Sequence, residues 1–120
     1  MKKQLRNLLL ILFMTASVSV FAGPTPRATV QAFLIAARAG NMVGVKRCLN
    51  GGNKLGNADA SGIAAMRLMF KNARITRIEK VNSYHFVVYV RIANPATGET
   101  ENFPMSVKKI NGDWKICDSK

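Results

Sequence analysis

The chain has 120 residues and a formal net charge of +12, from 18 Lys and Arg against 6 Asp and Glu. This length is enough for one domain and too short for two domains of ordinary size. With one His and two Cys, the sequence offers no set of ligands at metal-site spacing, and the Gly-rich segment lacks the GK[ST] ending of a phosphate loop. We therefore predict no metal and no cofactor.

The first 22 residues have the three-part pattern of a secretory signal peptide. A cationic start precedes an unbroken apolar run, and small residues lead up to Ala22. We expect cleavage after Ala22, which leaves residues 23–120 as a single domain in the periplasm or secreted. No later apolar stretch is long enough to span a membrane, so no transmembrane segment is expected after cleavage.

Helical spacing and capping residues predict three helices in the first half of the mature chain. Thr25 is placed to cap the first helix, and Gly40 is placed to end it. Asn41 is placed to cap a second, shorter helix. A Gly- and Asn-rich loop over 50–60 follows, and Ser61 is placed to cap the third helix.

From Ala73 onward the apolar residues recur with a period of two, which predicts strands. We expect strands over 74–81 and 84–92 and a third one that includes 103–107. The imperfect alternation of the first strand indicates a bulge. Pro104 indicates an edge position, a bulge or an outward-facing backbone nitrogen.

Asn111 and Gly112 predict a two-residue type I′ turn, because both of its positions require a positive φ angle. The register of this hairpin sets Val107 opposite Ile116 and places Cys117 on the other face of the sheet. One apolar face is then expected to carry four of the side chains: Met105, Val107, Trp114 and Ile116.

Three helices followed by an antiparallel meander make an α+β protein. An aromatic-bearing helix that continues into the letters AGN and a terminal NGDWKI accompany this order. With these motifs the chain, from about Thr25 to Asp118, resembles the nuclear transport factor-like superfamily. Within that superfamily it is similar to exported families such as domain of unknown function 4878. Asn41 replaces the usual acidic residue, which keeps the capping ability and loses a charge.

The resemblance implies an α-α-α-β-β-β-β cone with helices on the concave side of a curved sheet and a pocket between the two layers. Many relatives dimerise through the sheet, so a homodimer is an expectation as well. Relatives include isomerases, dehydratases and non-catalytic modules, so the fold does not imply one activity.

An apolar pocket inside the cone would suit a small apolar ligand. The alternative is that the same side chains only fill the core. The expected lining consists of Phe33, Phe86, Val88, Val90, Met105 and Trp114.

Cationic side chains recur along the third helix, the first strand and the last hairpin. They favour an acidic envelope component, such as a phosphate, an anionic headgroup or an acidic protein; the alternative is a solvated positive surface. The pattern carries no nucleic-acid recognition motif, so nucleic acid is not expected. The predicted basic surface comprises Arg67, Lys71, Arg74, Arg77, Lys80, Arg91, Lys108 and Lys115.

No catalytic residue is predicted. None of the six acids falls on the expected apolar face, His85 is expected to point away from it, and no nucleophile–base set is evident. We therefore expect a non-catalytic binding or accessory module. The alternative is a small isomerase- or dehydratase-like enzyme of the same superfamily.

Cys48 and Cys117 are the two cysteines of the chain. In an oxidising compartment an even number of cysteines favours a disulfide, and we expect these two to form one. The alternative is two separate thiols, one of them on an apolar helix face.

Overall fold

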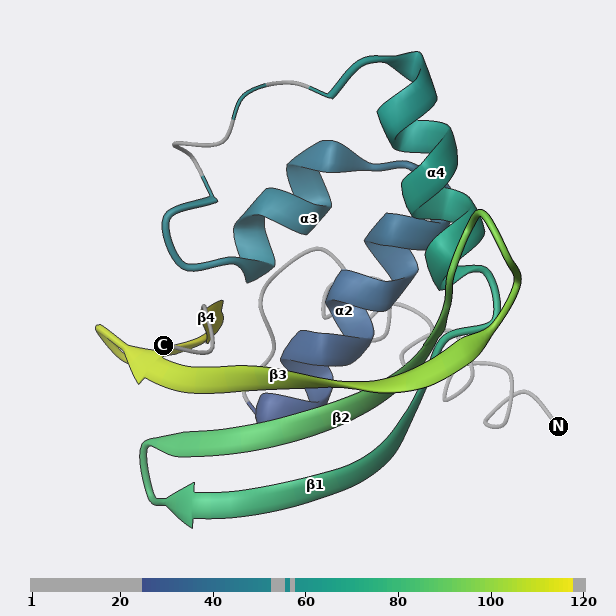
Figure 1. Ribbon diagram of the computed structural model, residues 1–120. Helices are drawn as coiled ribbons and strands as arrows, with labels where there is room; N and C mark the ends of the chain where they lie inside the picture. Colours follow the sequence, from purple (N-terminus) through teal and green to yellow (C-terminus); the bar gives the residue numbers. More distant parts are fainter. Residues whose placement is uncertain (1–24, 53–55, 57, 118–120) are drawn as a thin grey trace, which may run out of the picture.

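The computed structural model describes residues 25–52, 56 and 58–117, where three helices pack on a four-stranded antiparallel sheet (Figure 1). This confirms the predicted α+β class and element order; the segment predicted to be a signal peptide lies outside the described residues. No helix in this part of the chain is long and apolar enough to cross a membrane. The elements are α2 (Pro26–Ala39), α3 (Met42–Cys48), α4 (Ala60–Phe70), β1 (Arg74–Asn82), β2 (His85–Ala93), β3 (Thr100–Ile110) and β4 (Asp113–Cys117).

Side-chain caps set where the helices begin. Thr25 caps α2 and Asn41 caps α3, as predicted. The prediction for α4 was wrong by two residues, because Asp59 is its cap. The Asp59 carboxylate accepts hydrogen bonds from the Gly62 N–H at 2.8 Å and the Ser61 hydroxyl at 3.1 Å. These hydrogen bonds lower the pKa of Asp59, since they favour its charged form.

Gly40 ends α2 in the left-handed conformation, with φ of 71°. A Cβ at this position would lie 3.0 Å from Ile63 Cγ2 and 3.1 Å from Arg67 Cδ. The turn between α2 and α3 therefore needs glycine for its backbone angles and for its close approach to α4.

The last hairpin has the predicted register. Asn111 and Gly112 both have positive φ, 51° and 86°, as a type I′ turn requires. Val107 pairs with Ile116 across β3 and β4. The sheet order is β1-β2-β3-β4, and the helices lie on one side of the sheet (Figure 1). The buried core lies between the helices and this side of the sheet.

Strand β1 carries two register shifts against β2, one between Ile75 and Arg77 and one between Lys80 and Asn82. The predicted bulge is therefore confirmed. Pro104 lies in a stretch of β3 that pairs with β2 but extends past the end of β4. It thus occupies a local edge of the sheet, where proline is tolerated.

The core forms between α2 and the inner face of the sheet. Its rings meet edge to face: Phe33 with Phe70 at 5.3 Å between centroids, and Phe86 with Trp114 at 5.5 Å. Thr29 is fully buried, and its hydroxyl lies 3.4 Å from the carbonyl oxygen of Trp114, which ties α2 to β4. The side chains with no exposed surface are Thr29, Val30, Ala37, Val88, Val90 and Val107.

The expected disulfide is not formed, and both thiols are free. Leu49 makes an isolated parallel β-bridge with Ile116. Cys48 precedes Leu49 in the chain and Cys117 follows Ile116, so each cysteine is next to one residue of this bridge. Cys48 is buried in the core, whereas Cys117 pairs with Ser106 on the outer face of the sheet. Strand β4 therefore separates the two thiols. Burial raises the pKa of the Cys48 thiol, and the ammonium of Lys115 offsets part of this rise.

Truncating Phe33 tests whether its ring is part of the core. We expect Phe33→Ala to lower the free energy of unfolding by about 3–5 kcal/mol, because the change leaves a cavity beside Phe70. Tyr84→Ala is the matched control, since 68% of Tyr84 is exposed, and should cost less than about 0.5 kcal/mol. Urea unfolding measures both values, and equal costs would contradict the assignment.

The raised pKa of Cys48 predicts a pH-dependent stability. The folded protein holds the Cys48 proton more tightly than the unfolded chain does. The free energy of unfolding should therefore fall as the pH rises above about 8.5, the ordinary pKa of cysteine. Cys48→Ala should remove this component, whereas Cys117→Ala should keep it. Urea unfolding with reductant between about pH 7 and 10 measures the slopes, and the same slope in both variants would refute the prediction.

Candidate functional site

The structure brings four residues of the predicted basic surface together. Arg67 lies in the last turn of α4, and Lys71 is the residue that caps this helix. Arg74 begins β1, and Arg91 pairs with it from β2. These side chains come from α4, β1 and β2, which meet where the β2–β3 turn curves toward α4 (Figure 1).

Three hollows adjoin one another at this place. The strand hollow, about 510 Å³, lies between α2 and β1 and is lined by Arg27, Arg38 and Arg74 among others. The helix hollow, about 490 Å³, contains Arg38 together with Arg67 and Lys71. The turn hollow, about 410 Å³, lies between the end of α4 and the β2–β3 turn and combines Lys71 and Arg74 with Arg91.

We call this surface the basic corner and define it by Arg27, Arg38, Arg67, Lys71, Arg74 and Arg91. The linings of its three hollows contain no carboxylate. In the part of the chain that the structure describes, the ion pair joins Arg77 to Glu79 at 3.4 Å and involves no member of the corner. The corner is therefore a concentration of uncompensated positive charge.

Two members of the corner, Arg27 and Arg38, were missed by the sequence analysis. Both belong to α2, and together with Gln31 they follow the helical spacing that places residues on one face. This spacing was a usable signal, but nothing in it indicates that the face lies beside β1. That relation depends on how α2 crosses the sheet.

Arg38 is held in place by the backbone at the end of α4. Its Nε donates a hydrogen bond to the carbonyl oxygen of Phe70 at 3.0 Å, and its Nη2 donates to the carbonyl oxygen of Ala73. The guanidinium thus links α2 to the backbone between the end of α4 and the start of β1. It also fixes one positive charge between two of the hollows.

The structure places Arg91 apart from Lys108 and Lys115. The register sets Arg91 opposite Arg74, whereas Lys108 pairs with His85 near the other end of β2. Arg91 therefore belongs to the basic corner. Lys108 and Lys115 pair with each other across the last hairpin.

The other predicted cations lie away from the corner. Arg77 contacts Glu79 and covers the ring of Tyr89, with 4.3 Å from its guanidinium carbon to the ring centroid. Lys80 lies on β1 opposite Phe86, close to the β1–β2 turn. The predicted basic surface is thus divided into the corner at one end of the sheet and separate cations toward the other.

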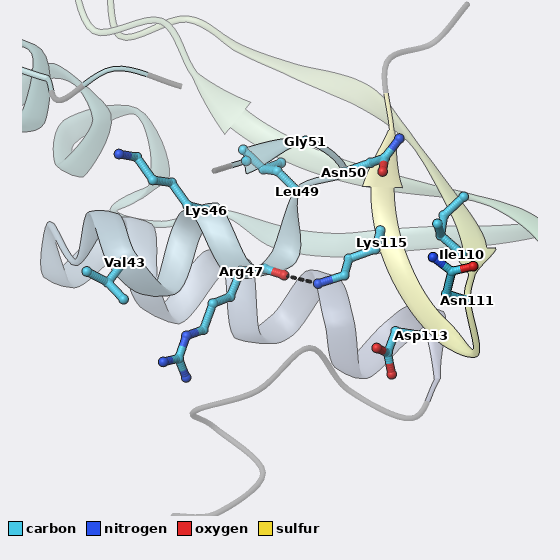
Figure 2. Close-up of a pocket in the computed structure, with 11 residues that line it drawn as sticks. Val43, Lys46, Arg47, Leu49, Asn50, Gly51, Ile110, Asn111, Asp113 and Lys115 are labelled. Atoms are coloured by element: carbon cyan, nitrogen blue, oxygen red, sulfur yellow. Dashed lines mark hydrogen bonds between the residues drawn. The ribbon is translucent and has the colours of Figure 1, made fainter. Parts of the chain in front are cut away.

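A fourth hollow, about 530 Å³, lies between α3 and the β3–β4 turn (Figure 2). Lys115 donates a hydrogen bond from its Nζ to the carbonyl oxygen of Arg47 at 2.6 Å, which connects β4 to the end of α3. Lys46 also lines this hollow, and so does the carboxylate residue Asp113. Because the lining has both signs of charge, this hollow is less suited to an anion than the corner is.

The six side chains predicted to line an apolar pocket lie together at the interface of helices and sheet. Phe33, Val88, Val90, Met105 and Trp114 belong to the buried core, and Phe86 packs against it. The four hollows described above are lined by other residues. Ligand binding by these six side chains stays a prediction.

The residues weighed for catalysis lie apart from one another. Glu79 and His85 both lie on the outer face of the sheet, where His85 Nε2 is 3.4 Å from Ser106 Oγ. Asp59 caps α4, and Asp113 lies at the last turn. Among the residues that the structure describes, no group of three or more His, Cys, Asp or Glu side chains is placed to hold a metal ion.

Comparison with models of protein families, with curated proteins and with solved structures gives no match to this chain.

Proposed function

We propose that this protein is a non-catalytic binding module that attaches to an acidic component of the cell envelope through the basic corner. The observation that carries the proposal is the lining of three adjoining hollows by six cationic side chains without a carboxylate. Like charges gathered on one surface repel one another, and an anionic partner would reduce that repulsion.

Export belongs to the same proposal. The signal-peptide pattern that ends at Ala22 supports action in the periplasm or outside the cell, where phosphates and anionic headgroups are abundant partners. The order of three helices and a four-stranded antiparallel meander supports membership of the nuclear transport factor-like superfamily and a cone-shaped domain.

Charge reversal at the corner tests the proposal. We expect Arg67→Glu combined with Lys71→Glu to weaken binding to phosphatidylglycerol vesicles by about 30-fold or more, because each cation near an anionic surface contributes about 1 kcal/mol. Vesicle sedimentation measures the affinity, and raising the salt concentration should weaken the binding of the unchanged protein.

The matched control is Lys80→Glu combined with Lys108→Glu, which changes the net charge equally at the other end of the sheet. This double variant should keep most of the affinity. Equal losses in the two double variants would show attraction by net charge alone and would reject the corner as the site. Binding that does not respond to salt would reject it as well.

A further inference from the structure

The turn hollow of the basic corner has the features of a site for one particular anion. Three cations line it, and each comes from a different element: Lys71 caps α4, Arg74 begins β1 and Arg91 lies near the end of β2. Glu99 and Glu101 flank the lining residue Thr100 along the chain, but neither of them lines the hollow.

Arg74 and Arg91 are directly opposed across β1 and β2. Opposed residues on antiparallel strands carry their side chains on one face, about 5 Å apart at Cβ, and like charges in this position are destabilising. Arg91 Nη2 donates a hydrogen bond to Thr100 Oγ1 at 2.9 Å, which orients the guanidinium without neutralising it. The hydrogen bond leaves both positive charges in place, so an anion bound between the two side chains would reduce their repulsion.

The number of charges selects the anion. One carboxylate would leave two of the three cations uncompensated, whereas a phosphate monoester carries close to two negative charges at neutral pH. Its three terminal oxygens also match the paired donors of the two guanidinium groups. Asn72 and Asn94 add polar groups to the lining.

The rest of the hollow is too large and too apolar for an ion alone. Its volume of about 410 Å³ lies in the range of small-molecule pockets. Leu68, of which 53% is exposed, lies on its rim, and the other apolar side chains of the lining are Met69, Ile92, Ala93 and Pro95. A ligand that fills the hollow would therefore have an apolar body next to its anionic group.

We propose that the turn hollow binds a phosphate monoester attached to a small apolar body, held by Lys71, Arg74 and Arg91. This inference rests on the proposed function, because it names the ligand class of the same corner. The phosphate can come from a soluble ester or from a lipid that ends in a phosphate monoester.

Thermal unfolding and calorimetry with phenyl phosphate test the soluble source, and vesicles of phosphatidic acid in phosphatidylcholine test the lipid source. We expect a saturable rise in unfolding temperature with phenyl phosphate and a much weaker response to inorganic phosphate, which lacks the apolar body. Benzenesulfonate has a similar shape with one charge, and it should bind at least about tenfold more weakly than phenyl phosphate.

Arg74→Gln should raise the dissociation constant for phenyl phosphate at least about tenfold, because it removes a charge-assisted hydrogen-bond donor. Without ligand, the same variant should unfold at the same temperature as the unchanged protein or higher, since it relieves the repulsion from Arg91. A purely structural role for Arg74 would instead lower that temperature. Lys108→Gln, which removes a cation from another part of the sheet, is the matched control and should bind normally.

Binding of phosphatidic acid vesicles that is sensitive to Arg74→Gln, with no response to phenyl phosphate, would support the inference and assign the source to a lipid. Inorganic phosphate as effective as phenyl phosphate would overturn it, and so would an equal loss in Lys108→Gln. Absence of binding in both arms would also overturn it. If phosphatidylglycerol vesicles still bound through Arg67 and Lys71, the proposed function would stand without the phosphate site.

Discussion

The fold depends on covering one apolar face of a four-stranded meander with helices, mainly with α2. Val88, Val90 and Val107 give that face side chains with no exposed surface, and α2 supplies Val30 and Ala37 against them. Removing this much apolar surface from water is the main stabilising contribution to a domain of this size. A polar group buried between the two layers needs a hydrogen-bond partner there. The Thr29 hydroxyl has the carbonyl oxygens of Thr25 and Trp114 as partners.

This constraint also explains the position of the basic corner. Once α2 lies across the sheet, Arg27 and Arg38 lie beside the start of β1. Arg38 also lines the hollow at the end of α4. The cations cannot enter the core, because burial of an unpaired charge is costly. They gather at the rim, where Arg38 satisfies the carbonyl oxygens of Phe70 and Ala73 and the others line open hollows.

Local sequence signals predicted the features that depend on a few neighbouring residues, such as the turn at Asn111 and Gly112. The cap of α4 was misplaced because Asp59 and Ser61 precede the same apolar run and both residue types cap helices. Part of the corner was found because Arg67 and Arg74 are close in sequence. The contribution of α2 and the pairing partner of Arg91 depend on helix crossing and strand register, which no local pattern specifies.

The two edge strands of the sheet, β1 and β4, are protected from further strand pairing in different ways. At β4, the segment after α3 lies alongside the strand, and the Asn50 N–H donates to the carbonyl oxygen of Ile116 at 2.8 Å. At β1, two bulges interrupt the edge, and Arg77 and Lys80 add charge to it. Among the described strands, neither edge is a flat template for a strand of another molecule. Growth into filaments by strand addition is thereby disfavoured, because the backbone shape of the edges works against it in addition to the net charge.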